Sequence, residues 1–240
     1  MRNLIIAALM LFPAFLNAQE FTSEVEKAVK DAIPGTSVDS VEPSELPGIY
    51  MVTAGSNVFY FHLEKRLLIF GEIMTTTGTN YTKPNREKAM RSTLSRATDS
   101  SLTIQYGEPL NVVYEFTNPE CGACLGYEER LKQQPYENTV RHIFFLSWSP
   151  TAKQKLEHIM CSEDKERAKE LVYSGADIKE FASCEYGRNL VEKQAMTARN
   201  LGVDRTPTFF VNGTKVVGGN MGKIHSLLKE KSHVENTESD

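Results

Sequence analysis

The chain has 240 residues, of which 40% are hydrophobic and 24% charged, and its 27 basic and 31 acidic residues leave a net charge of −4. This length suits one large domain or two small ones and allows a full core, so the chain does not need disulfides merely to fold. Because no basic stripe or tail is present, nucleic acid is not an expected partner.

The amino terminus has the three parts of a secretory signal peptide. Arg2 supplies a positive charge, an apolar run from Leu4 to Leu16 follows, and Asn17-Ala18 offers a cleavage site. The run is shorter than the roughly 20 residues that a bilayer span needs, which argues against a membrane anchor. We therefore predict a signal peptide over residues 1–18, cleavage after Ala18 and export of the remaining chain.

A small α+β unit is predicted next. Ser23 and Glu26 have capping-box spacing at the start of a short helix, and Pro34-Gly35 ends it. Three segments rich in β-branched and aromatic residues then predict strands, and such a sheet has free edges that favour pairing with another chain. The predicted elements are the helix 22–33, the strands 48–54, 57–62 and 67–74, a polar linker 75–84 and a mostly polar connecting helix 85–97.

From residue 102 strands and helices alternate, which indicates an α/β layout. Asn212-Gly213 has the composition of a tight hairpin turn between two apolar segments. The predicted strands are 102–106, 111–116 and 139–147, the helices are 121–133, 151–161, 165–175, 187–202 and 221–231, and the hairpin covers 206–219.

A zinc site does not explain the four cysteines. Cys121 and Cys124 form one close pair, but Cys161 and Cys184 are 23 positions apart and do not form the second pair that a structural zinc site requires. His158 lies one turn before Cys161, but a single histidine on a helix is more often an ordinary surface or core residue.

In an exported protein four cysteines predict disulfides, and they allow three connectivities. The economical one joins Cys121 to Cys124 and Cys161 to Cys184. The second of these bridges closes a long loop, which chain-entropy arithmetic makes worth about 3–4 kcal/mol. The first closes almost no loop, so a purely structural role explains it poorly.

The segment TNPECGACLGYEE, residues 117–129, favours a reactive dithiol. A strand precedes Cys121 and a helix follows it, so Cys121 is predicted at a helix N-terminus, where free N–H groups and the helix dipole favour a thiolate. The thiolate is the attacking species in disulfide exchange. Cys124, one turn further into the helix, is predicted to be more buried and nearer neutral.

Residues 117–129 resemble the dithiol motif of the thioredoxin superfamily, in which a cis-proline loop faces the two cysteines. LGVDRTPTFFVNGT, residues 201–214, places Thr206-Pro207 at the matching point, before an apolar strand. Nearly the whole chain resembles the DsbC/DsbG family of periplasmic thiol:disulfide interchange proteins, and DsbC more than DsbG. The most specific matches are this loop and the second cysteine pair inside IMCSEDKERAKELVYSGADIKEFASC, residues 159–184.

The resemblance implies an α/β protein whose C-terminal thioredoxin fold carries a helical insert and follows a small α+β, cystatin-like dimerisation domain and a linker helix. It implies a V-shaped homodimer with both dithiols facing an uncharged cleft, and a structural disulfide between Cys161 and Cys184. The implied segments are the signal peptide 1–18, the dimerisation domain 19–80, the linker helix 81–100, the catalytic domain 101–232 and a flexible tail 233–240.

The resemblance also implies a function, that of a periplasmic disulfide isomerase. Cys121 would attack wrong disulfides in exported clients, and either a client thiol or Cys124 would resolve the mixed disulfide, with Thr206 and Pro207 facing the dithiol. A membrane electron donor resembling DsbD would keep Cys121 reduced, and no metal or organic cofactor is needed. The rival functions are a monomeric oxidase, a DsbG-like reductase of cysteine sulfenic acids and a chaperone with little catalysis.

Two features depart from DsbC. Gly122-Ala123 stands between the cysteines where DsbC has Gly-Tyr, and this dipeptide tunes the redox potential. Glu115 lies where thioredoxin and DsbA carry a buried acid and DsbC an apolar residue. A buried Glu115 would have a raised pKa and would accept the Cys124 proton. The alternative is an exposed strand glutamate, since the alternation around it leaves its face ambiguous.

Overall fold

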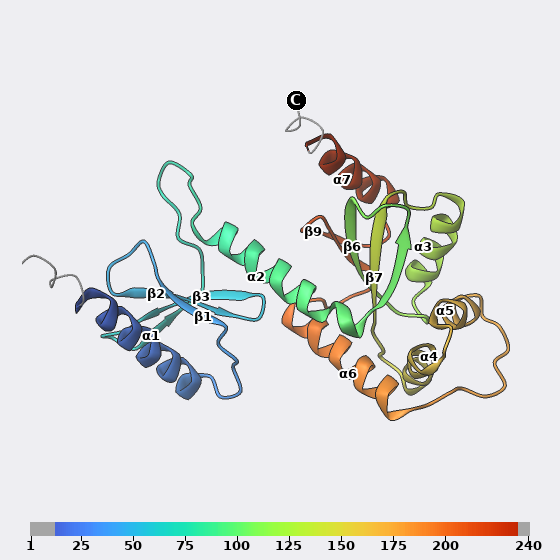
Figure 1. Ribbon diagram of the computed structural model, residues 1–240, viewed down its shortest axis with the longest axis horizontal. Coiled ribbons are helices and arrows are strands. Elements are labelled where there is room, and N and C mark those ends of the chain that lie inside the picture. The colour runs from blue at the N-terminus through green and yellow to red at the C-terminus, as the bar shows by residue number, and fades with distance from the viewer. Residues whose placement is uncertain (1–12, 235–240) are drawn as a thin grey trace, which may run out of the picture. The chain divides into compact units, whose positions relative to one another are not determined.

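The structure is a computed structural model that describes residues 13–234, and the chain forms two compact units that meet in sequence between Ala89 and Met90 (Figure 1). Most of the predicted signal peptide, and residues 235–240 of the predicted tail, lie outside the described residues. Within residues 13–234 no helix is both long and apolar enough to cross a bilayer.

The first unit packs one helix against a four-stranded antiparallel sheet of order β1-β2-β3-β4 (Figure 1). Val25 and Val29 of the helix contact Val52, Phe59 and Phe61 of the two central strands, and these side chains form the core of the unit. The elements are α1 (Pro13–Ala32), β1 (Ser40–Pro43), β2 (Ile49–Ala54), β3 (Asn57–His62) and β4 (Leu67–Ile69).

Three details of this unit differ from the sequence prediction. The helix is already present at Pro13, where the described residues begin, instead of starting at residue 22, and no helix-breaking residue lies between Pro13 and Pro34. The strand β1 was not predicted, since SVEP contains one β-branched residue and is held by pairing with β2. The strand predicted over 67–74 ends at Ile69, and beyond it only Met74 makes an isolated bridge, to Asn80.

The helix α2 (Thr82–Ala97) is shared between the two units. Ala89 packs with Tyr60 in the first unit, while Leu94 packs with Phe116 and Phe144 in the second. The helix predicted over 85–97 is therefore present but begins at Thr82, and its two halves belong to different cores. A short 3-10 helix, η1 (Thr98–Ser100), follows it.

The second unit is built on a mixed five-stranded sheet of order β5-β7-β6-β8-β9, in which β6 runs parallel to β7 and the other pairs are antiparallel. The parallel pair places the C-terminal ends of β6 and β7 side by side (Figure 1). The elements are β5 (Leu102–Tyr106), β6 (Asn111–Thr117), α3 (Gly122–Gln133), β7 (Thr139–Phe145), α4 (Pro150–Cys161), α5 (Lys165–Tyr173), α6 (Glu185–Asn200), β8 (Thr208–Val211), β9 (Thr214–Val217) and α7 (Met221–Val234).

Besides α2, two groups of helices pack against this sheet. α3 and α7 pack on β6, β8 and β9, with Tyr127 and Ile224 among the contacts. α4, α5 and α6 pack over β5 and β7, where Ile143 and Leu156 are fully buried. The predicted hairpin is present, and its turn Asn212-Gly213 has positive φ at both residues, as a type I′ turn requires.

Candidate active site

Cys121 caps the N-terminus of α3 at the end of the strand β6. The loop before it is fixed by Asn118, whose side-chain oxygen accepts a hydrogen bond from the backbone N–H of Glu120 at 2.6 Å. The carbonyl of Cys121 accepts hydrogen bonds from the backbone N–H groups of Cys124 and Leu125. The half-exposed Cys121 side chain therefore lies at the helix end where unpaired N–H groups favour negative charge.

The loop before β8 lies against Cys121. The Thr206–Pro207 peptide bond is cis, and the Cys121 thiol donates to the carbonyl oxygen of Thr206 across 3.4 Å. Pro207 is buried, and its carbonyl accepts a hydrogen bond from Gly218 N–H at 2.8 Å, which anchors the loop to the end of β9. The structure thus brings Cys121, Thr206 and Pro207 together.

The two thiols have opposite pKa shifts. Burial alone raises the pKa of Cys121, but hydrogen bonds from the side chains of Thr206 and Cys124 and from the N–H groups of Cys124 and Ala123 outweigh it and lower the pKa. Cys124 is fully buried, and burial raises its pKa to about 12 although Thr206 and Thr117 favour its thiolate. The site therefore holds one nucleophilic thiol beside one that stays protonated at neutral pH.

Glu115 is fully buried in β6, which settles the face left open by the sequence. Arg141 of β7 donates from Nε and Nη2 to Oε2 of Glu115, at 2.8 and 2.6 Å. Oε1 of Glu115 has no hydrogen-bond partner. Burial raises the pKa of this carboxyl, and Arg141 opposes the shift. Glu115 thus has one oxygen held by a cation and one oxygen available to carry a proton.

Two further charged side chains complete a buried cluster with Glu115 and Arg141. Glu128 of α3 pairs with Arg141 and accepts a hydrogen bond from Lys169 Nζ of α5 at 2.7 Å. Burial alone raises the pKa of Glu128, but the two cations outweigh it and lower the pKa to about 2. The cluster contains two acids and two bases, so its charges balance where water is excluded.

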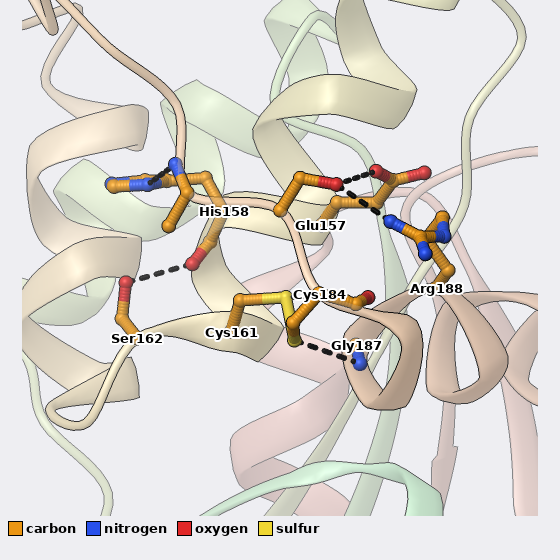
Figure 2. The surroundings of a disulfide bond; sticks show 9 residues. Glu157, His158, Cys161, Ser162, Cys184, Gly187 and Arg188 are labelled. Atoms are coloured by element: carbon orange, nitrogen blue, oxygen red, sulfur yellow. Dashed lines mark hydrogen bonds between the residues drawn. A yellow bond between two sulfur atoms is a disulfide. The ribbon is translucent and has the colours of Figure 1, made fainter.

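A disulfide joins Cys161 at the end of α4 to Cys184 at the start of α6 (Figure 2). Polar contacts hold the chain around it: His158 Nδ1 accepts from Ala182 N–H at 2.9 Å, and Ser183 donates to Glu157 at 3.1 Å. His158 therefore has a structural role, because it holds the backbone of the segment before Cys184. The bridge closes the helical insert, and together with these polar contacts it ties the segment before Cys184 to α4.

Gly187 is required beside this disulfide. Its N–H donates to Cys184 Sγ at 3.2 Å, as Figure 2 shows. A Cβ at this position would overlap Cys161 Sγ and approach Cys184 Sγ to 3.1 Å. Only a residue without a side chain leaves room for the bridge.

Sequence reasoning named the cysteines, Glu115 and the Thr206-Pro207 loop, but it missed the partners of Glu115. Arg141 is the one charged side chain in a strand that is apolar from Ile143 to Phe145, and this was the one available signal. Glu128 and Lys169 lie in helices with charges on several sides, so nothing in their spacing marked them as buried. Arg141 faces Val113 across the strand pair, a register that only the fold supplies.

Comparisons with known proteins find one family model and several solved structures that match parts of the chain. Residues 16–83 match the family described as disulfide bond isomerase protein N-terminal domain. A linker-deletion mutant of Proteus mirabilis ScsC is 16% identical with a TM-score of 0.52, over 61% of this chain and 82% of that one. The thiol-disulfide exchange protein alpha-DsbA2 from Wolbachia pipientis is 14% identical with a TM-score of 0.50, over 65% of this chain and all of that one. At these identities the likeness shows the fold, which is thioredoxin-like. A search of curated protein sequences finds no match.

Proposed function

We propose that the chain is a periplasmic protein disulfide isomerase of the DsbC/DsbG family, and the match of residues 16–83 to the disulfide bond isomerase N-terminal domain supports this proposal. The observation that carries the proposal is the pairing of two unlike thiols: half-exposed Cys121 with a lowered pKa, and buried Cys124 with a pKa near 12. In such a pair the thiolate of one cysteine attacks a disulfide of another protein, and the protonated thiol of the other cysteine can later resolve the mixed disulfide.

In the proposed reaction the Cys121 thiolate attacks one sulfur of a non-native disulfide in an exported protein. A mixed disulfide forms, and the other client sulfur leaves with the electron pair. When a different client thiol then attacks the mixed disulfide, Cys121 is released and the client disulfide has moved, which is isomerisation. When Cys124 attacks instead, Cys121 and Cys124 become oxidised and the client is reduced.

We assign Thr206 and Pro207 to client positioning. The hydrogen bond of Cys121 to the Thr206 carbonyl supports this role, since that loop flanks the sulfur that would carry the client. A loop fixed by buried Pro207 presents its backbone to an extended client chain in a constant position.

We assign Glu115 the role of proton acceptor for Cys124. Its burial, its raised pKa and the open Oε1 support this role, because a buried acid with one free oxygen can take a proton without solvent. Arg141 fixes the other oxygen and so holds the carboxyl in one orientation.

A homodimer is the proposed assembly, formed through the first unit. Residues 16–83 match the disulfide bond isomerase N-terminal domain, and the resemblance to the DsbC/DsbG family implies dimerisation through this unit. The strand β4 at the sheet edge exposes Leu67 and Ile69, and Phe70 beside it is 70% exposed. The opposite edge strand carries Glu42 and Pro43, which disfavour pairing. The apolar β4 edge is therefore the better candidate interface.

Periplasmic localisation and two kinds of partner complete the proposal. The predicted signal peptide supports export. The clients are misoxidised exported proteins, and a membrane electron donor resembling DsbD is proposed because isomerisation requires a reduced Cys121.

Trapping of the mixed disulfide tests the proposal. In the Cys124→Ser variant the proposed resolving thiol is absent, so an unfolded protein that carries one disulfide should accumulate as a covalent adduct at Cys121. The Cys121→Ser variant, with Cys124 intact, is the control and should give no adduct. Adducts at Cys124, or none with either variant, would contradict the assignment of the nucleophile.

Two measurements separate the rival functions. Reduction of a cysteine sulfenic acid without turnover of scrambled disulfides would favour the DsbG-like reductase, and retention of full activity in Cys121→Ser would favour a chaperone. Light scattering tests the dimer: the wild-type protein should be dimeric and an Ile69→Lys variant monomeric. A Lys65→Glu variant in the neighbouring exposed turn serves as a charge-changing control. A monomeric wild-type protein would contradict the assembly.

A further inference from the structure

The hydroxyl groups of Tyr173 and Thr117 form a hydrogen-bonded chain from the helical insert to Cys124. Tyr173, the last residue of α5, donates from its phenol to Thr117 Oγ1 at 3.1 Å. Thr117 is the last residue of β6 and is fully buried. Its side-chain hydrogen bond to Cys124 favours the thiolate and so lowers the pKa of Cys124, against the effect of burial. Because an accepted hydrogen bond polarises the hydroxyl that receives it, Tyr173 strengthens the bond that Thr117 makes to the sulfur.

The phenol of Tyr173 is held in place from two sides. Lys169 lies one turn earlier on α5, and its ammonium is 5.0 Å from the centre of the Tyr173 ring while it also binds Glu128. On the sheet side the ring packs against Phe145, with ring centres 6.4 Å apart. The same face of α5 thus supplies one cation to the buried charge cluster and one hydroxyl to the dithiol.

We propose that Tyr173 is a positioning residue for the resolving step, in which it holds the Thr117 hydroxyl on the Cys124 sulfur while that sulfur attacks the mixed disulfide at Cys121. This inference rests on the proposed dithiol function and makes the helical insert part of the active site. The helix α5 then has a chemical role in addition to a structural one.

The step balances within the molecule and its client. Cys124 gives its proton to Glu115, the proposed acceptor, its thiolate attacks Cys121 Sγ, and a new bond forms between these two sulfurs. The bond between Cys121 and the client sulfur breaks, and the client sulfur leaves with the electron pair and ends as a thiol after taking up one proton. The client is reduced by two electrons, and the dithiol is oxidised by two. No other oxidant or reductant takes part.

The need for support is greatest at Cys124, because negative charge develops there in a buried site. Donors already aimed at a developing charge lower the barrier without reorganisation. Tyr173 remains a donor throughout, because burial raises its pKa well above the usual value and the hydrogen bond with Thr117 opposes this shift only in part. Lys169, over the ring, is the neighbouring cation.

The test uses the full-length protein and measures two steps separately: the reactivity of the Cys121 thiolate, and the release of the Cys121 adduct by Cys124. Reduced protein is mixed with oxidised glutathione, and release of glutathione from the Cys121 adduct is followed from pH 6 to pH 10. Tyr173→Phe should resolve the adduct about fivefold more slowly at neutral pH, as expected for the loss of one hydrogen bond, and its pH profile should move to higher pH. Alkylation of Cys121 should keep the wild-type rate.

Matched variants complete the design. Tyr186→Phe removes an exposed phenol from the same insert and should behave as wild type. Thr117→Val should slow resolution like Tyr173→Phe, whereas Thr117→Ser keeps the hydroxyl and should restore it. A Tyr173→Phe variant with the wild-type rate and pH profile would overturn the inference, as would an equal loss of Cys121 alkylation. A wild-type protein that never forms or releases the adduct would instead overturn the proposed function, and this inference with it.

Discussion

The Cys121 thiol lies 3.4 Å from the carbonyl oxygen of Thr206, although 85 positions separate these residues in the sequence. Cys121 comes from the N-terminus of α3 and Thr206 from the loop before β8, and the pairing of β6 with β8 brings the two together. A chain bound at the Cys121 sulfur would therefore run beside a rigid backbone segment. The geometry of the site therefore rests on this long-range contact as well as on the CGAC motif.

Cys121 should be the only cysteine that is rapidly alkylated in the protein with a reduced dithiol. Cys124 is buried with its pKa raised to about 12, and Cys161 and Cys184 are bridged. Because the thiolate is the reacting species and the pKa of Cys121 is lowered, the alkylation rate should rise with pH and reach its half-maximum below pH 9. A short iodoacetamide pulse followed by mass spectrometry measures this. First labelling at Cys124 would assign the nucleophile to the other thiol.

Loss of the Arg141 guanidinium should destabilise the fold strongly. Arg141→Met leaves Glu115 and Glu128 buried without their shared cation, which should cost about 3–5 kcal/mol in urea unfolding. Arg167→Met is the matched control, because Arg167 pairs with Glu170 on the surface and such pairs contribute about 1 kcal/mol or less. Equal effects of the two substitutions would show that the buried cluster contributes no more than a surface pair.

The elements of the fold were largely predictable because their signals are local. The dipeptide Asn212-Gly213 is enough to predict a tight hairpin turn, and the apolar segments on either side of it predict the two strands. The strand β1 was missed, since Ser40–Pro43 has little strand preference and is held by β2. In the site, the cysteine spacing was visible in the sequence. The contacts of Glu115 with Arg141, and of Tyr173 with Thr117, were not, because they join residues 26 and 56 positions apart.

The disulfide between Cys161 and Cys184 should be structural. Replacement of both cysteines by serine should lower the free energy of unfolding by about 3–4 kcal/mol, the loop-entropy value for a bridge of this span. The alkylation rate of Cys121 should not change, because the bridge joins α4 and α6 away from that thiol. Loss of Cys121 reactivity in a double variant that still folds would count against a purely structural bridge.

Gly187→Ala should destabilise the same region although alanine favours helices. The added methyl group would collide with Cys161 Sγ, so the bridge or the first turn of α6 must shift. Gly126→Ala in α3 is the control, since its methyl group would meet only Arg130 Nη1 at an ordinary 3.5 Å. Thermal unfolding should give a lower Tm for Gly187→Ala and an equal or higher Tm for Gly126→Ala. A Gly187→Ala protein as stable as wild type would mean that the disulfide accommodates the methyl group.

Reactivation of scrambled ribonuclease tests the central claim most directly. The reduced wild-type protein, in catalytic amount and in a glutathione buffer, should restore ribonuclease activity well above the rate of the buffer alone. Cys121→Ser should abolish this gain, because no other exposed thiol is present among the described residues to start the exchange. Failure of the wild-type protein to accelerate reactivation, or equal acceleration by Cys121→Ser, would contradict disulfide isomerisation at Cys121.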